Sequence, residues 1–442
     1  MSKFSKLMII TLLLLLTACN RPQGEVTRSP KDIEVTQETI EDPDKPDQLP
    51  DTSQPEDTDI PPTLEDPTPQ PPPPTAKPKE IVLEGDPIAP LLAGAGVDFK
   101  EIHMLNDQIG WGLATNDERI YHLVRTEDGG YTWRDITPPQ PDIPNTTRIY
   151  PDVHFSDPDT GWMIFRHTDL VWLTKDGGIN WVPVRLEYNA LQGGLVTNLG
   201  QDQIWLFQFL DGGMQKVYTA LYKSSDGGYT WTKLLDPSMT PDYSIQGFDK
   251  TGVDFLDFDY GWLTRHFRGV SPDVRLDITS DGGITWGPLD IPAPPSAPDA
   301  FNNCACGLLN PDLNSRQVGS VYLECTCMEG GTVFTKNYIY QTVDGGLDWD
   351  IQSVPEGEFH KISDQTYYAI GREIYRTDDG GENWDLMKTV TWDGRFSFVN
   401  DTTALGVAYD PEDEEYALVK TTTSCSTFEI IVPVILNSLT IR

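Results

Sequence analysis

The stretch Thr126-Glu127-Asp128-Gly129-Gly130-Tyr131-Thr132-Trp133 decides the fold of this 442-residue chain, because the same pattern returns five more times. Each copy has a Ser or Thr two residues before an Asp-Gly-Gly, and a Trp three residues after the second Gly. The Asp and Trp of the six copies are Asp128 and Trp133, Asp176 and Trp181, Asp226 and Trp231, Asp281 and Trp286, Asp344 and Trp349, and Asp379 and Trp384. Successive Trp residues are 48, 50, 55, 63 and 35 positions apart, a period typical of stacked or radial repeats.

The sequence between the copies predicts strands and no helices. A short apolar run, a turn and often a Gly-Trp precede a third run that leads into the motif, and the motif Trp opens a fourth. Four short strands per repeat predict an all-β fold, a seven-bladed β-propeller of four-stranded antiparallel blades. Six units carry the motif and a seventh lacks it, and they span about 97–135, 150–184, 195–235, 250–289, 303–354, 359–388 and 396–436. The ring would close through either Ile81-Val82-Leu83 or the C-terminal run, and the sequence leaves this choice open.

The repeated motif has the chemistry of a tight turn. Its two glycines permit positive φ between the third and fourth strands. The Asp carboxylate is expected to accept backbone N–H groups of that turn, the Ser or Thr hydroxyl to add another hydrogen bond, and the Trp ring to pack inward. One Asp per turn supplies too few oxygens for Ca²⁺. We therefore assign the motif residues to the fold and not to catalysis, and we predict no metal site and no cofactor.

The pattern Ser/Thr-x-Asp-x-Gly-x-x-Trp resembles the Asp-box, or BNR, repeat of sialidases, sortilin-type receptors and xyloglucan-degrading enzymes. The compact unit in which Gly-Trp and a short strand precede Asp-Gly-Gly-x-Thr-Trp most resembles bacterial propellers related to the photosystem II assembly and stability factor. The resemblance covers about residues 97–436 and implies the propeller fold. It implies much less about activity, because such propellers include both enzymes and plain binding modules.

The N-terminus resembles that of a bacterial lipoprotein precursor. Lys3 and Lys6 precede an apolar run over 7–16, which is too short to span a bilayer, and Leu16-Thr17-Ala18-Cys19 matches a lipobox. We therefore expect a signal peptide over 1–18 and lipid on Cys19. Two or three acyl chains would anchor the protein stably to a membrane.

The segment that follows is predicted to be a disordered tether over residues 19–80. Residues 20–80 contain 15 prolines in 61 positions and no aromatic residue, so the segment cannot bury enough surface to fold. The propeller is then expected over 81–442. This organisation predicts an extracytoplasmic protein, attached by lipid to the membrane of a bacterium.

The net negative charge of the expected propeller restricts the kinds of partner that it can bind. Residues 87–442 hold 24 Lys and Arg against 51 Asp and Glu, a net charge of −27. Such a surface disfavours nucleic acid and direct docking on anionic lipid. The expected partners are an envelope or membrane protein, or a glycan, and the propeller is expected to be a monomer.

Four cysteines form a Cys-x-Cys…Cys-x-Cys pattern in the fifth unit. Opposite residues of an antiparallel hairpin have a constant index sum, and Cys304 with Cys327 and Cys306 with Cys325 both add up to 631. One register therefore places both pairs face to face, which favours two disulfides in an oxidising compartment. A Cys₄ zinc site and free thiols remain as alternatives. Cys425 lies where the turn of the seventh unit should be and has no evident partner.

Candidate binding residues lie on one face of the expected ring. The loops between the second and third strands, and between blades, lie on the face opposite the motif turns, and these loops are long and irregular. We call this side the loop face. Loops on a rigid scaffold carry function more often than the scaffold does. The aromatic and basic candidates there are Arg148, Tyr150, Arg166, His167, Tyr243, Arg265, His266 and Arg268.

The favoured function is a non-enzymatic binding or scaffold module for an envelope protein partner. The alternative is a carbohydrate-active propeller, either a sialidase-like or other glycoside hydrolase or a glycan-binding lectin, in which Tyr150 and Tyr243 would stack on sugar rings. Arg119 and Arg125 are the only arginines between the tether and the first motif, and neither lies in the Arg-Ile-Pro-type motif of sialidases. No catalytic residues are assigned. The sequence leaves enzymatic activity undecided, with a glycoside hydrolase as the class to expect if there is one.

Overall fold

The computed structural model describes residues 81–437, apart from 118, 144–145, 147, 214–215, 238–244 and 268, and apart from the side chains of 211–216. The predicted signal peptide, Cys19, the tether, Tyr243 and Arg268 lie outside the described residues. Among the described residues, no helix is long and apolar enough to cross a membrane.

Strands make up almost all of the regular structure, in agreement with the all-β prediction. A four-residue helix, α1 (Ala300–Asn303), precedes β17. The strands are β1 (Asp98–Met104), β2 (Gly110–Thr115), β3 (His122–Thr126), β4 (Thr132–Asp135), β5 (Pro151–Phe155), β6 (Gly161–Phe165), β7 (Leu170–Thr174), β8 (Val182–Arg185), β9 (Gly193–Leu199), β10 (Gln203–Gly213), β11 (Lys216–Ser224), β12 (Thr232–Leu235), β13 (Asp249–Phe255), β14 (Gly261–His266), β15 (Arg275–Thr279), β16 (Gly287–Asp290), β17 (Cys304–Leu313), β18 (Gly319–Glu329), β19 (Thr332–Thr342), β20 (Asp350–Val354), β21 (Glu358–Lys361), β22 (Tyr367–Ile370), β23 (Glu373–Thr377), β24 (Asp385–Thr389), β25 (Asp393–Phe398), β26 (Ala404–Asp410), β27 (Glu415–Thr421), β28 (Glu429–Ile431) and β29 (Val434–Leu436).

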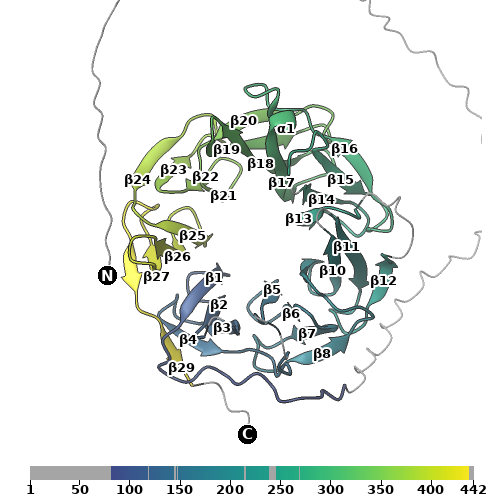
Figure 1. Ribbon diagram of the computed structural model, residues 1–442, viewed down its shortest axis with the longest axis vertical. Coiled ribbons are helices and arrows are strands. Elements are labelled where there is room, and N and C mark those ends of the chain that lie inside the picture. The colour runs from purple at the N-terminus through teal and green to yellow at the C-terminus, as the bar shows by residue number, and fades with distance from the viewer. Residues whose placement is uncertain are drawn as a thin grey trace, which may run out of the picture. The chain divides into compact units, whose positions relative to one another are not determined.

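Consecutive strands pair in antiparallel groups of four, which we call blades and name by their strands. The β13–β16 and β17–β20 blades share one eight-stranded sheet only because His266 pairs with Gly307 across β14 and β17. Figure 1 shows the blades arranged in a ring, with first strands such as β1, β5, β21 and β25 toward the centre. This radial arrangement of four-stranded antiparallel sheets is that of a β-propeller.

The C-terminal run closes the ring. β29 pairs in parallel with β4, with Ile435 opposite Trp133, and so adds a fifth strand to the β1–β4 blade. The fourth strand expected over 428–436 is thus divided between two sheets, with β28 in the last blade and β29 in the first. Pro433 lies between them, and proline has no N–H with which to continue a ladder.

The six motif turns share one hydrogen-bond pattern. In the first, Asp128 Oδ1 accepts the backbone N–H groups of Tyr131 at 3.1 Å and Thr132 at 2.9 Å. The Thr126 hydroxyl donates to the same carboxylate and accepts the N–H of Gly130, both at 2.9 Å. Gly129 and Gly130 have φ of 75° and 101°. These bonds pair the polar groups of the turn, and together with the positive φ values they account for the repetition of the Ser or Thr, the Asp and the two glycines.

The last blade has a substituted version of the same turn. Thr421 Oγ1 accepts the N–H of Cys425 at 3.1 Å, as Thr126 accepts that of Gly130, and Thr423 Oγ1 accepts the N–H of Thr427 at 3.0 Å in place of an Asp. Ser424 and Cys425 have φ of 52° and 62° where the motif has glycine. The seventh unit, which was expected to lack the motif, therefore keeps the geometry of the motif turn. Thr423 replaces the Asp, Ser424 and Cys425 replace the two glycines, and Phe428 replaces the Trp.

The core lies between neighbouring blades, and the second-strand tryptophans are among its largest buried side chains. Trp111, Trp162, Trp205 and Trp262 are at most 5% exposed. Of the motif tryptophans, Trp133 and Trp286 are buried, whereas Trp181, Trp231, Trp349 and Trp384 are only partly buried. Inward packing of the motif Trp, as expected, holds fully for two blades, while the second-strand Trp is buried wherever it occurs.

Neighbouring blades differ most in length at one place in the ring. In the β17–β20 blade, β18 and β19 have 11 residues each, whereas β22 has four and β23 has five in the next blade. The longer hairpin is joined to β17 by the disulfides Cys304–Cys327 and Cys306–Cys325, which confirms the predicted pairing. Cys425 is a free, buried cysteine.

Candidate ligand-binding surfaces

Two of the predicted loop-face residues come together with two carboxylates. The Tyr150 hydroxyl donates to Glu101 Oε2 at 3.0 Å, across 49 positions of sequence. The Arg166 guanidinium lies 5.0 Å from the centroid of the Tyr150 ring and contacts Asp152 Oδ1 at 3.4 Å. Asp152 also accepts the N–H of Gly194 at 3.0 Å. The cluster joins the first strands of two adjacent blades.

The carboxyl groups of this cluster bind protons more readily than ordinary ones. Burial raises the pKa of Glu101, although the hydrogen bond from Tyr150 lowers it in part. Burial also raises the pKa of Asp152 against the opposing charge of Arg166. Two such carboxyls beside a tyrosine and an arginine can both accept and donate hydrogen bonds, which suits the hydroxyl groups of a sugar.

The remaining predicted residues are dispersed. Arg148 is exposed, and exposed His167 has a φ of 69° and donates its backbone N–H to Ala190. His266 packs against the backbone of Gly307. Arg265 is only 4% exposed, in contrast to its expected surface position, because β14 extends through it into the blade.

Arg265 belongs to a buried ionic group. Its Nε lies 3.1 Å from Asp277 Oδ2, and its guanidinium covers the ring of Phe248 at 4.1 Å. Lys250 lies nearby and donates to the carbonyl of Phe248 at 2.7 Å. Burial lowers the pKa of Lys250 to about 7, with the charges of Asp249 and Asp277 opposing that shift. These contacts hold three strands of one blade together and leave Arg265 little surface for a ligand.

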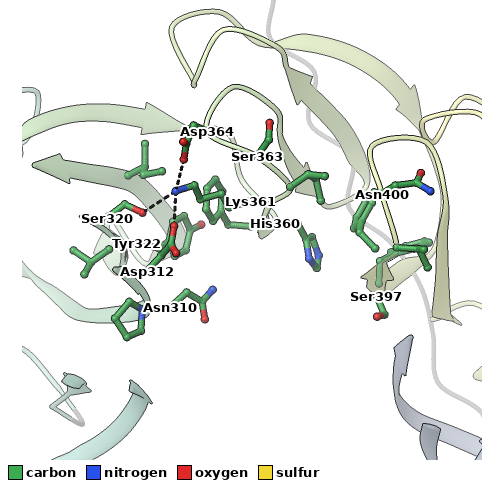
Figure 2. A pocket seen from close by; sticks show the side chains of 18 of the residues that line it. Asn310, Asp312, Ser320, Tyr322, His360, Lys361, Ser363, Asp364, Ser397 and Asn400 are labelled. Atoms are coloured by element: carbon green, nitrogen blue, oxygen red, sulfur yellow. Dashed lines mark hydrogen bonds and ion pairs between the residues drawn. The ribbon is translucent and has the colours of Figure 1, made fainter. Parts of the chain in front are cut away.

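A cavity of about 790 Å³ opens near the centre of the ring, and none of the predicted binding residues lines it. It is bounded by β1, β17, β18, β19, β21 and β25 and by the turns after β21 and β25 (Figure 2). Lys361 and His360 are adjacent on β21 and point in opposite directions, as strand geometry requires. The polar groups drawn in Figure 2 are Asn310, Asp312, Ser320, Tyr322, His360, Lys361, Ser363, Asp364, Ser397 and Asn400.

The charged groups of this cavity are paired with one another. Lys361 Nζ binds Asp312 of the neighbouring blade and Asp364 Oδ1 at 3.1 Å. Burial would lower the pKa of Lys361, but the hydrogen bonds and charges of the two carboxylates outweigh it and raise that pKa. Lys361 is therefore an ammonium ion at neutral pH, which makes it a structural cation and not a nucleophile.

The first strands carry a recurring polar side chain that was not among the predicted site residues, and four of its seven members, His103, Asp312, His360 and Ser397, line this cavity. One lies near the end of each first strand, at His103, His154, Thr197, Asp254, Asp312, His360 and Ser397. Ser397 Oγ accepts the N–H of Met104 at 2.7 Å, and Asp254 Oδ2 accepts that of Leu313 at 2.8 Å, so these side chains join adjacent blades. A polar residue inside an apolar strand, recurring at the repeat period, was the available signal.

A metal site does not form in this part of the molecule. Burial lowers the pKa of both His103 and His154, and His154 Nε2 is 2.6 Å from Asn198 Oδ1. Among the described residues, no three His, Cys, Asp or Glu side chains gather in a way that could hold a metal ion.

A second cavity lies on the loop face, between the β17–β20 blade, which we call the long blade, and the β21–β24 blade, which we call the short blade. It measures about 390 Å³, and its walls come from β18 and β19 on one side and from the ends of the next two blades on the other. Its charged residues are Glu324, Glu356, Glu358, Asp393 and Arg395. Asn337 is 3% exposed and lines the same cavity, and its Oδ1 has no hydrogen-bond partner.

Comparison with known proteins yields a partial relative and several distant structural matches. No protein-family model matches the chain. Over 196 residues, 44% of this chain, it is 24% identical to the chloroplastic photosystem II stability/assembly factor HCF136 of Arabidopsis thaliana. The match spans 45% of that protein, so the chain covers less than half of the relative's length.

The solved structures that match are distant. A GH74 xyloglucanase from Xanthomonas campestris is 15% identical with a TM-score of 0.33, and the match covers 75% of this chain and 64% of the enzyme. A PL25 ulvan lyase is 12% identical with a TM-score of 0.44, covering 77% and 94%. An α-L-arabinanase from Penicillium chrysogenum is 12% identical with a TM-score of 0.37, covering 76% and 99%. Likenesses at this level carry no argument about activity, and they leave undecided whether the chain is an enzyme.

Proposed function

We propose that this chain is a lipid-anchored, extracytoplasmic lipoprotein whose seven-bladed propeller binds an envelope protein without catalysis. The observation that carries the proposal is the long β18–β19 hairpin. It extends past the neighbouring blade, bears Met328 at 70% and Val333 at 58% exposure, and is held to β17 close to this tip by two disulfides. An exposed apolar tip on a rigid support is typical of a protein-docking surface.

Other features support the same proposal. The two disulfides favour an oxidising, extracytoplasmic compartment. The ion-paired Lys361 leaves the central cavity without an activated nucleophile among its lysines. The partial relative is by name an assembly factor, and we carry over only that class of role, assistance to a protein assembly, and not its photosystem.

Capture by the detergent-solubilised full chain tests the docking surface. The double variant Met328→Glu/Val333→Glu should reduce recovery of the captured envelope protein about tenfold or more, because carboxylates replace the apolar contact. Leu347→Glu is the matched control, since Leu347 is 82% exposed and lies in a motif turn on the opposite face. Equal capture by all three proteins would overturn the proposed docking surface.

The lipid anchor is tested separately. Cys19→Ala should move the protein from the membrane fraction to the soluble fraction and abolish incorporation of a labelled fatty acid. Retention of the label in the variant would overturn the proposed lipidation of Cys19.

The cluster of Glu101, Tyr150, Asp152 and Arg166 supports a second candidate, a carbohydrate-active propeller. Its carboxyls have raised pKa values and lie beside a tyrosine hydroxyl and a guanidinium. A glycan array and a panel of chromogenic glycosides test it. Glycoside turnover that disappears in Glu101→Gln or Asp152→Asn would replace the non-enzymatic proposal, and glycan binding without turnover would indicate a lectin.

A further inference from the structure

One face of the β18–β19 hairpin extends beyond the short blade, and we call this part of the hairpin the overhang. Along it, the residues change from buried aromatic and aliphatic, through polar, to exposed apolar at the tip. Residues directly opposite each other in the hairpin share a face, and here they are Tyr322 with Ile339, Glu324 with Asn337, Thr326 with Thr335, and Met328 with Val333. The first pair is buried, and the Tyr322 ring stacks on Phe359 of the next blade at 4.7 Å. Beyond that contact the short blade ends. Asn337 is still buried, but Met328 and Val333 at the tip are exposed.

The reverse face of the hairpin is anchored through its cysteines. Cys325 and Cys327 lie there, are at most 4% exposed, and are disulfide-linked to β17. They share a core cluster with Ala300 and Phe301 of α1. The overhanging face is therefore held in a fixed position, and its outermost pair, Met328 with Val333, is exposed.

The cavity beneath the overhang has a strong excess of negative charge. Glu324, Glu356, Glu358 and Asp393 line it against the single guanidinium of Arg395. Asp393 is paired with Arg372 at 3.0 Å, and Glu358 lies 3.6 Å from His360 Nε2. Glu324 and Glu356 form no ion pair among the described residues. Four carboxylates thus face one guanidinium in this cavity, and two of the four, Glu324 and Glu356, have no ion-pair partner there.

A buried acceptor without a donor lies in the same cavity. Asn337 uses its Nδ2 to donate to the carbonyl of Pro355 at 3.4 Å, while its Oδ1 accepts nothing. Leaving such a group unpaired in a buried position is unfavourable, because its hydrogen bond to water is lost and not replaced. Together with unneutralised carboxylates on two sides, it calls for a cation that donates several hydrogen bonds and accepts none, and an ammonium group has these properties.

We propose that this cavity receives a lysine side chain of the envelope protein that docks on the overhang. The inference rests on the proposed protein-binding function and adds the chemistry of recognition. The ammonium would donate to Asn337 Oδ1 and be neutralised by Glu324 and Glu356, while the segment around it covers Met328 and Val333. Lysine suits the cavity better than arginine, because the acceptors come from separate elements and do not form one planar carboxylate pair. The exposed apolar tip favours a polypeptide over a free polyamine.

Peptide arrays test the proposal with the full chain in detergent. The probes are extended apolar peptides with one central lysine, and matched peptides with norleucine in its place. We expect lysine peptides to bind at least about tenfold more tightly than norleucine peptides, and Glu324→Gln/Glu356→Gln to abolish that preference. Glu329→Gln is the control, because Glu329 is exposed on the same hairpin but on its other face. Equal melting temperatures would show that all variants are folded.

The outcomes separate this inference from the proposed function. Equal binding of lysine and norleucine peptides, or a preference that survives in Glu324→Gln/Glu356→Gln, overturns the lysine site. Binding of spermidine in place of lysine peptides, or occupation of the face by a second copy of the chain, overturns it as well. Partner capture that depends on Met328 and Val333 would still stand in each case. Capture that ignores those two residues would overturn the docking surface itself.

Discussion

The motif turns on one face and the overhang on the other arise in opposite ways. The turns are alike because each copy uses the same Asp, hydroxyl and glycines to satisfy one backbone shape, as in Asp128 and Asp226. The overhang exists because two neighbouring repeats differ, with 11-residue strands beside strands of four and five. Identical repeats present the same surface around the ring, whereas a difference in length between two repeats creates the overhang, a surface that a partner can recognise.

Removing the disulfides should have the largest effect on this contrast. Replacing all four of Cys304, Cys306, Cys325 and Cys327 by alanine should lower the free energy of unfolding by about 2–5 kcal/mol. The loss should concentrate in the overhang, so hydrogen exchange should accelerate in 320–340 while the motif turns stay protected. An equal increase in hydrogen exchange in all blades would contradict the conclusion that these disulfides stabilise the overhang in particular.

Disrupting one motif turn should lower the free energy of unfolding by less than removal of the disulfides does. Asp226 accepts the N–H and the hydroxyl of Thr230 at 2.9 and 2.6 Å and the hydroxyl of Ser224 at 2.8 Å. Asp226→Ala should therefore lower the free energy of unfolding by about 1–2 kcal/mol, a value reduced by partial exposure of the turn. Thr423→Ala, at the equivalent place in the substituted turn, should cost about half as much because its bonds are uncharged. Denaturant titration measures both.

Acid should distinguish regular turns from the substituted one. The N–H of Asn383, with the Thr377 hydroxyl, lowers the pKa of Asp379 to about 2 from an ordinary value of 3.8. A depressed carboxyl pKa adds stability that is complete above about pH 4 and is lost as the pH falls through about 2. The difference in denaturation midpoint between wild type and Asp379→Thr, which imitates the substituted turn, should shrink over that window. A difference that stays constant would show that ionisation of Asp379 contributes nothing.

Introducing glycine into the substituted turn should change the free energy of unfolding least. Ser424 has a φ of 52°, a left-handed conformation that costs a residue with a Cβ about 1–2 kcal/mol. Its hydroxyl donates to the carbonyl of Asp401 at 3.2 Å, which offsets part of that cost. Ser424→Gly should therefore raise the free energy of unfolding by only about 0.5 kcal/mol. A clear loss of stability would show that the hydrogen bond outweighs the backbone strain.

Much of the fold could be predicted because its causes are local. The glycines, Asp and hydroxyl of a turn lie within eight residues, and apolar alternation marks each strand. The disulfides were also predictable, because the register of one hairpin fixes which cysteines face each other. The turn of the last blade was expected at Cys425, but its geometry was not, because Thr423, Ser424 and Cys425 replace the Asp and the two glycines and their hydrogen bonds and positive φ appear only in the structure.

The candidate sites could be predicted only in part. Tyr150 and Arg166 were expected on the loop face, but their contact with Glu101 depends on how two blades pack. Asn337 and Glu324 gave no signal, since their importance comes from the missing neighbour of a long hairpin.

The sequence by itself determined the strands, the turns and the cysteine pairs, because each depends on residues close together or on a single register. Tertiary structure alone decided that β29 closes the ring against β4, that Lys361 binds two carboxylates from different elements, and that one blade overhangs the next. These features depend on how whole blades pack against one another, and no local sequence pattern specifies that packing.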